Sequence, residues 1–269
     1  AGRTLDDLES SIPEIERVAR TSVGERKTVG GGRYSDLDLK ANGAGLGGVT
    51  QADINDIWNS AIEDTENSEL ARKIIDELNM APRERSFWND ALKLPNRARY
   101  WYEISSEGFK DFLRLSDENV KRFIALIAAT SPRADPIDSL RRGFGSLAQY
   151  LSGRPIDVDL TIPESVREAI EFGTLTGLKT GSFGGTMQYM LGLEKTAPLS
   201  TNDRQVASSF NVTGDDIAKN PILYETLSRF YINLRDKVNA NLPEDVEPFE
   251  TWQLQALGWV EERAVIGER

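Results

Sequence analysis

Residues 116–132 read SDENVKRFIALIAATSP, a polar start followed by an almost continuous apolar run. Ser116 has the short hydroxyl side chain that is typical of a helix N-cap, and the next two residues place negative charge in the first turn. Ser131 and Pro132 end the run, because a residue before proline avoids the helical region. This stretch therefore predicts a buried helix, and the rest of the chain follows the same pattern.

Helical signals recur along most of the chain, and together they predict a mainly α fold. Residues 158–162 (VDLTI) are the only short stretch that favours a strand. The glycines clustered between residues 23 and 49 predict a long loop or linker. Further helices are expected over residues 4–20, from Thr50 through Ile62, and over 68–80, 136–151, 163–173, 182–192, 203–210, 214–219, 221–240 and 251–264.

Composition limits the chemistry open to this chain. Its 269 residues include 32 basic and 43 acidic ones, a net charge of -11, with no Cys and no His. A thiolate nucleophile, an imidazole base and Cys or His metal ligands are therefore excluded, which leaves carboxylates, Lys, Tyr, Ser and backbone dipoles. No apolar run approaches the ~20 residues of a membrane span and no secretory signal is visible, so we expect a protein without a membrane partner.

The charge is spread unevenly. Residues 83–154 carry 13 basic and 9 acidic residues, whereas the segments on either side are strongly acidic. The basic residues of this middle segment form either a local basic face for nucleic acid or ordinary solvated helix surfaces, and charge alone leaves both readings open. They include Arg97, Arg99, Lys110, Arg114, Lys121, Arg122, Arg133, Arg141, Arg142 and Arg154.

Two features of the C-terminal half suggest chemistry. Residues 175–183 read LTGLKTGSF directly before a helical run, and a glycine-rich hairpin that opens a helix exposes N–H groups able to hold a phosphate. Asp203, with Arg204, follows twenty residues beyond Phe183 at the start of another predicted helix. Its carboxylate either stabilises a cation and aligns a water, or simply caps the helix.

Taken together, these features resemble the helix-hairpin-helix DNA glycosylase superfamily. Leu175, Gly177 and Leu178 match its hairpin pattern, and Asp203 stands where that family has its catalytic Asp. The chain is more similar still to a bacteriophage-associated branch that acts on modified bases. The elements shared with that branch are, in order, Trp101-Tyr102, the turn from Ile127 to Pro132, the hairpin from Gly177 to Phe183, Asp203-Arg204 and the closing stretch from Gln253 to Trp259.

The resemblance covers about residues 95–265 and implies a helix-hairpin-helix glycosylase-like domain over residues 83–269. Residues 1–82 are then an extra N-terminal helical segment that contains the glycine-rich loop. The implied partner is DNA carrying modified bases, and the implied location is the cytoplasm of a bacterial host or phage-infected cell.

The resemblance also assigns roles to residues. Asp203 is the expected catalytic carboxylate and Lys179 a second catalytic candidate, while Gly181 replaces the Lys nucleophile of bifunctional relatives, so a monofunctional enzyme is expected. No metal or cofactor is implied. The expected base pocket comprises Trp101, Tyr102, Ser131, Arg133 and Phe183. The expected contacts to the DNA backbone come from Gly177, Lys179, Gly181 and Arg204.

Two alternatives remain open at the level of sequence. A related phage enzyme can keep the same fold and transfer a group, such as an amino acid, onto an activated modified thymine. A catalytically silent helical protein, for example a virion component or a protein-binding module, would also explain the acidic flanks and the glycine-rich segment.

Overall fold

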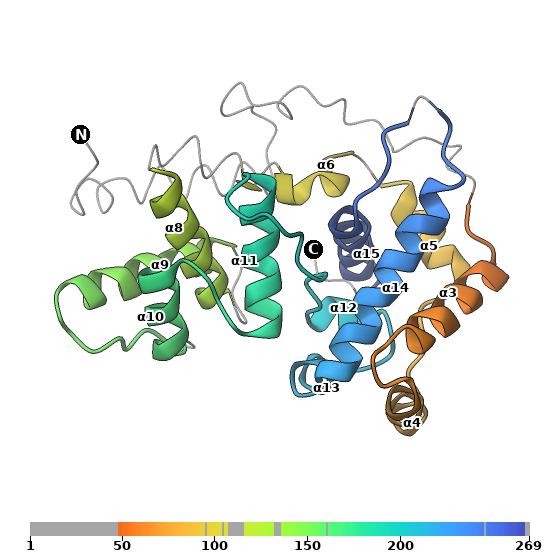
Figure 1. The fold of residues 1–269 in the computed structure, drawn as a ribbon, viewed down its shortest axis with the longest axis horizontal. Helices are drawn as coiled ribbons and strands as arrows, with labels where there is room; N and C mark the ends of the chain where they lie inside the picture. Colours follow the sequence, from red (N-terminus) through yellow and green to blue (C-terminus); the bar gives the residue numbers. More distant parts are fainter. Residues whose placement is uncertain are drawn as a thin grey trace. The chain divides into compact units, whose positions relative to one another are not determined.

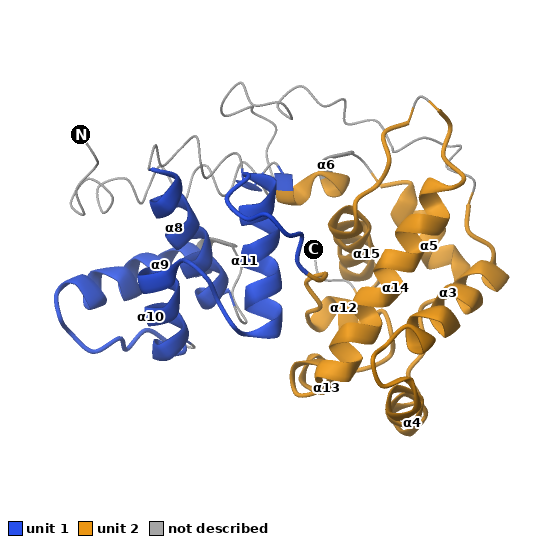
Figure 2. Cartoon of the chain, viewed as in Figure 1, with its two compact units in different colours: residues 1–36, 103–198 blue, residues 37–102, 199–269 orange. Residues whose placement is uncertain are grey.

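The computed structural model describes residues 48–94, 96–103, 105–106, 116–131, 136–159, 161–244 and 246–266. The chain divides into two compact units, one comprising residues 1–36 and 103–198 and the other residues 37–102 and 199–269 (Figure 2). This division cuts the sequence differently from the boundary expected at residue 82. The helices, labelled in Figure 1, are α3 (Gln51–Glu63), α4 (Ser68–Leu78), α5 (Arg85–Leu92), α6 (Asn96–Arg99), α8 (Asp117–Thr130), α9 (Pro136–Leu151), α10 (Pro163–Phe172), α11 (Leu178–Met190), α12 (Arg204–Ser208), α13 (Gly214–Ala218), α14 (Pro221–Asn239) and α15 (Thr251–Val265).

The first unit contains α8 to α11, and α8 is its most buried helix. Ser116 caps α8 by accepting a hydrogen bond from the N–H of Asn119, as the sequence predicts. Helix α11 lies close against α8 because Gly184 has no side chain: a Cβ there would lie 3.2 Å from the Cβ of Ala128. The side-chain amide of Gln188 then donates to the carbonyl oxygens of Lys121 and Gly173, which ties α11 to α8 and to the end of α10.

The second unit is built around buried aromatic rings contributed by segments far apart in the sequence. The ring of Phe230 on α14 lies 4.9 Å from that of Phe210 and 5.1 Å from that of Trp88, measured between centroids. Helix α15 approaches the same rings at Gly258, where a Cβ would lie 3.2 Å from both the Trp88 ring and the Tyr231 hydroxyl. These rings belong to one buried core that also contains aliphatic side chains of α3, α14 and α15.

Most expected helices are confirmed, because their signals are local. Thr50 and Asp53 form the predicted capping box of α3, and the helix expected over residues 136–151 has those bounds. Helix α11 begins at Leu178, four residues earlier than expected, so much of the expected hairpin is helical. The helix expected over residues 4–20, and nearly all of the glycine-rich segment, lie outside the described residues.

The strand expected over residues 158–162 is wrong. The N–H of Thr161 donates to the carbonyl oxygen of Val158 (3.1 Å), which closes a turn, and no strand occurs among the described residues. A lone β-branched run cannot form a sheet without a partner strand. Helices α5 and α6 were not expected from the sequence.

Arg99 does not belong to the basic face that was one of two readings of the middle segment. This side chain is buried, and its guanidinium donates to the Gln253 side chain and to the carbonyl oxygens of Glu247 and Pro248. It also lies 3.9 Å from the centre of the Phe249 ring. Arg99 therefore fixes the segment that leads into α15, and its guanidinium is not available to a phosphate.

Crossing a bilayer requires a helix of about 20 predominantly apolar residues. Within the part of the chain that the structure describes, no helix combines the length and apolarity that crossing a bilayer requires.

The aromatic core predicts that two Phe→Ala substitutions change the free energy of unfolding by very different amounts. Phe230 is fully buried, whereas Phe172 at the end of α10 is 68% exposed. We expect Phe230→Ala to lower the free energy of unfolding by about 3–5 kcal/mol and Phe172→Ala to change it by less than about 0.5 kcal/mol. Urea unfolding followed by Trp fluorescence measures this in the second unit, where all five Trp residues lie; circular dichroism is needed for Phe172→Ala. Equal effects would contradict the described core.

The capping box of α3 predicts a pH dependence. Hydrogen bonds from Lys237 and then Thr50 lower the pKa of Asp53 to about 2, from an ordinary 3.8. A carboxyl with a lowered folded-state pKa stabilises the fold above its unfolded pKa, and this contribution is lost as the pH falls through the folded value.

We therefore expect Asp53→Asn to lower the free energy of unfolding by about 1 kcal/mol at pH 7, a value reduced by the solvent exposure of Lys237. The difference from the wild type should disappear between about pH 4 and pH 2. Chemical unfolding at a series of pH values tests this, with Asp56→Asn as an exposed control on the same helix. A difference that is undiminished at pH 2 would show that the ionised carboxylate is not its cause.

Candidate functional site

Asp203 directly precedes α12 and is its N-cap. Oδ1 accepts hydrogen bonds from the backbone N–H groups of Gln205 (3.0 Å) and Val206 (3.2 Å). Oδ2 accepts a third hydrogen bond, from the indole Nε1 of Trp259 (3.1 Å). These three hydrogen bonds fix the direction of the carboxylate at both oxygens. The side chain is half-buried, so part of it still contacts solvent.

The backbone that leads to Asp203 is anchored to α14 by buried polar groups. The Tyr224 hydroxyl donates to the carbonyl oxygen of Ser200 (2.9 Å) and accepts from the N–H of Asn202 (3.1 Å). The side-chain amide of Asn202 donates to the carbonyl oxygen of Tyr224 and to the hydroxyl of Ser228, both at 3.0 Å. Because every one of these groups is buried, losing one partner would leave another unsatisfied, and the position of Asp203 is strongly determined.

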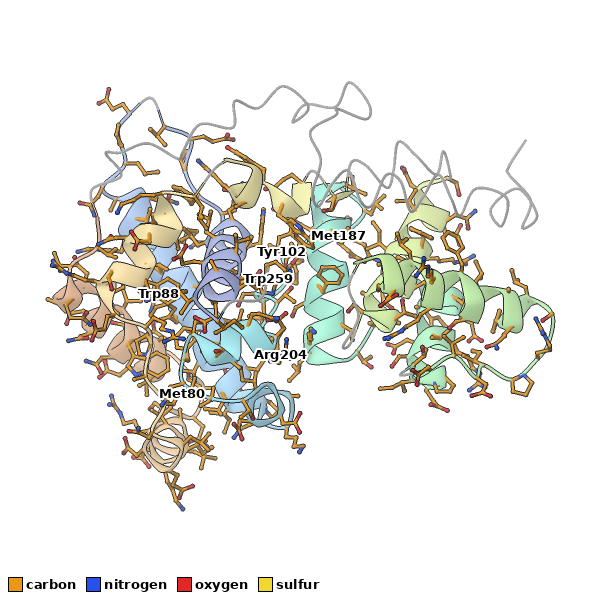
Figure 3. All side chains as sticks on the ribbon, turned by 180° about the vertical axis from the view of Figure 1, so that it is seen from behind. Met80, Trp88, Tyr102, Met187, Arg204 and Trp259 are labelled. Carbon is orange, nitrogen blue, oxygen red and sulfur yellow. The ribbon has the colours of Figure 1, made fainter. Side chains whose placement is uncertain are left out.

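Aromatic side chains lie beside this carboxylate. The rings of Trp259 and Trp101 are in contact, with 6.3 Å between centroids and a 36° tilt, and both are half-buried. Tyr102 packs edge-on against Trp101 at 4.9 Å and donates its hydroxyl proton to the side chain of Gln255 on α15 (2.9 Å). Figure 3 labels Tyr102 and Trp259 within this group. The guanidinium of Arg263 lies 4.8 Å from the centre of the Trp259 ring.

A second set of hydrogen bonds joins α12 to α15, at the C-terminal end of α12. The Glu262 side chain is fully buried and accepts two hydrogen bonds from the guanidinium of Arg83, at 2.7 and 3.1 Å, and one from the hydroxyl of Ser208 at 2.7 Å. The hydrogen bond to Glu262 raises the pKa of Arg83. Burial raises the pKa of the neighbouring Tyr231 phenol, and the charges of Asp203 and Glu262 raise it further, so this hydroxyl stays neutral.

The expected hairpin residues lie in the other unit. Gly177 is the N-cap of α11, and Lys179 and Gly181 fall in the first turns of that helix. A Cβ at Gly181 would lie 2.6 Å from the carbonyl oxygen of Leu175, so this position excludes a side chain. Lys179 and Phe183 are half-buried on the same helix.

The remaining expected residues have mixed outcomes. Ser131 ends α8, where its hydroxyl donates to the carbonyl oxygen of Ala128 (2.8 Å), and Arg204 is exposed at the start of α12. Arg133 lies outside the described residues. The structure thus brings Asp203 together with Trp101 and Tyr102 within one unit, and places Ser131, Gly177, Lys179, Gly181 and Phe183 in the other.

The sequence did not single out Trp259 as a member of the site. A signal was present: Gln255, Trp259 and Glu262 follow an i, i+4, i+7 pattern and place a polar stripe along one face of the helix. All three donate or accept hydrogen bonds across the second unit. A polar stripe on a buried helix face indicates partners elsewhere in the fold, although it does not say which ones.

This arrangement has two chemical capacities. A fixed, partly solvated carboxylate can stabilise a developing positive charge, and the adjacent indole rings can stack on a planar group. Among the residues that the structure describes, no three Asp or Glu side chains gather as a metal site would require.

Comparison with protein-family models, with curated proteins and with solved structures found no match to this chain.

The buried Glu262 predicts a strong effect of neutralising its charge. Glu262→Gln replaces one acceptor oxygen with an NH₂ group that faces the donors of Arg83 or Ser208, and we expect the free energy of unfolding to fall by about 3 kcal/mol. Glu63→Gln is the matched control, since Glu63 pairs with Arg72 and both side chains are largely exposed. Its loss should be only about 0.3–0.5 kcal/mol. Urea unfolding of both variants measures the contrast, and equal losses would contradict the described burial.

Proposed function

We propose that this protein is a monofunctional DNA glycosylase that hydrolyses the N-glycosidic bond of a modified or damaged base. The observation that carries the proposal is the fixed, half-buried carboxylate of Asp203 beside the paired indoles of Trp101 and Trp259. Bond cleavage at a sugar passes through an oxocarbenium-like state, and a nearby carboxylate stabilises that charge and orients water.

The aromatic rings support the second requirement of base excision. A target base must leave the helical stack before its bond can be cleaved, and aromatic side chains compensate for the lost stacking. Trp101 and Trp259 are both partly exposed, and Trp259 contacts the carboxylate directly, so a planar base stacked on these rings would bring its sugar near Asp203. The reaction then needs neither His nor Cys, which this chain lacks.

In this proposal, backbone N–H groups at the start of α11 bind the DNA phosphates, as in a helix-hairpin-helix motif, and basic side chains add to this binding. The N-cap of α11 is Gly177, which has no side chain to accept from the first N–H groups of the helix, and Lys179 lies in the first turn. Anions bind favourably at such helix starts. The resemblance to the phage-associated branch adds modified bases as the substrate class and the cytoplasm of a bacterial host or phage-infected cell as the location.

One observation favours a second candidate. Both oxygens of Asp203 already accept hydrogen bonds, as those of a purely structural cap do. A non-catalytic helical protein therefore remains the competing proposal, and it predicts neither base release nor DNA binding at low salt.

The test is Asp203→Asn. Asparagine caps helices as well as aspartate does, so the fold should be kept, while loss of the negative charge should reduce base release by at least about 100-fold. Mass spectrometry of small products, after incubation with unmodified and phage-modified DNAs, measures the released base, and alkali treatment reveals the abasic sites. Asp216→Asn, the same change in the capping box of α13, is the control expected to keep full activity.

The outcomes separate the candidates. Full activity of Asp203→Asn would overturn the mechanism, and a heavier nucleotide formed on adding an amino acid would indicate group transfer. Absence of any product, together with no DNA binding at low salt, would favour the non-catalytic protein.

A further inference from the structure

Among the described residues, Trp259 is the only side chain that donates a hydrogen bond to Oδ2 of Asp203. The other oxygen is held by backbone N–H groups of α12, which any sequence of that helix would supply. Rotation of the carboxylate about its last bond is therefore opposed by one side-chain donor, the Trp259 indole. We infer that Trp259 is a positioning residue, which sets the direction of the Asp203 carboxylate for the reaction; this inference rests on the proposed function.

The indole is itself held on several sides. Trp101 contacts its ring and the Arg263 guanidinium lies over it, at the distances given above. A cation over an indole ring draws electron density from the N–H group, which strengthens its donation to a carboxylate. Arg263 thus acts on Asp203 through the ring of Trp259.

The backbone of α15 is fixed on either side of Trp259 in the sequence. Gln255, one turn earlier, accepts from Tyr102, and Glu262, one turn later, accepts from Ser208 and Arg83. Ser208 lies at the end of the short helix that Asp203 begins, so α12 is joined to α15 at both of its ends. The bond between Ser208 and Glu262 therefore holds α12 close to α15, and the bond between Tyr102 and Gln255 fixes α15 on the other side of Trp259.

Trp259 has two separable properties in this arrangement. Its ring offers a stacking surface, which affects substrate binding, and its N–H group fixes the carboxylate, which affects the bond-breaking step. Trp259→Phe keeps an aromatic ring and removes the N–H group. The variant should therefore lower kcat more than it changes KM.

The kinetic test is a double-mutant cycle on the base-release reaction. We expect Trp259→Phe to lower kcat about tenfold, the effect of losing one hydrogen bond to a charged group, with KM within about twofold. In the Asp203→Asn background the same change should cause no further loss, because the carboxylate it positions is gone. Trp252→Phe, the same substitution two turns earlier on α15, is the matched control and should leave kcat unchanged.

A measurement without DNA keeps the inference separate from the proposed function. In Asp203→Asn the Oδ1 atom is needed by the α12 N–H groups, so the amide NH₂ faces the indole N–H, donor against donor. We expect the Trp259 indole proton in ¹⁵N-resolved NMR spectra to move upfield and its hydrogen exchange to accelerate at least about tenfold relative to the wild type. This comparison needs no Trp259 variant, so it stands even where Trp259→Phe fails to fold.

Each outcome decides one question. Unchanged indole exchange in Asp203→Asn, or a kcat of Trp259→Phe equal to that of the wild type or reduced additively in both backgrounds, overturns the positioning role. A wild-type protein that releases no base from any DNA, while the indole responds as expected, overturns the proposed function and leaves the described contact intact.

Discussion

A carboxylate removed from water has to be paired, and the fully buried Glu262 is such a carboxylate. Desolvating a single charge costs several kcal/mol, so the fold is stable only where donors meet both oxygens. Arg83 and Ser208 supply them. These two residues come from segments 125 positions apart in the sequence, and their meeting at α15 fixes the end of α12 and the chain that leads into α5. The site at Asp203 depends on that arrangement, because α12 has only five residues and no core of its own.

Helix α15 combines two functions that usually compete. Gly258 and its apolar neighbours pack against the aromatic core, while Gln255, Trp259 and Glu262 present hydrogen-bonding groups to other segments. A purely apolar helix would bury as much surface with less cost in desolvation. The polar stripe instead gives the helix one register, since a shift by one residue would separate every donor from its acceptor. In the proposed function, that register is what brings the indole of Trp259 to Asp203.

Local signals explain how much of the fold could be predicted from sequence. Thr50, Ser116 and Pro163 mark helix starts because a capping hydroxyl or a proline acts within three or four residues, and α3, α8 and α10 begin accordingly. Helices α5 and α6 are short, and their stability comes from packing against α15, which no local pattern reports. Residues 158–162 have β-branched side chains but no partner strand, and pairing, not propensity, decides whether a strand forms.

The contacts of the candidate site could not be predicted from sequence for the same reason. Asp203 is recognisable in the sequence, but its contact with Trp259 joins residues 56 positions apart. Arg99 illustrates the opposite error: its charge suggested a surface for phosphate, whereas three carbonyl or amide oxygens and the Phe249 ring hold it inside the protein. Residue type indicates which bonds a side chain is able to make, and only the fold determines which partner is present.

The hydrogen bonds to Asp203 also bear on which carboxylate chemistry the proposed reaction would use. A nucleophile or a general base needs a lone pair directed at the reacting atom, and here Oδ1 already accepts two hydrogen bonds and Oδ2 one. Electrostatic stabilisation of a cation needs only a fixed negative charge at short range, and it gains from donors that hold the carboxylate still. The same three hydrogen bonds that make Asp203 a good helix cap therefore favour, within the proposed function, stabilisation of an oxocarbenium-like sugar over covalent attack on it.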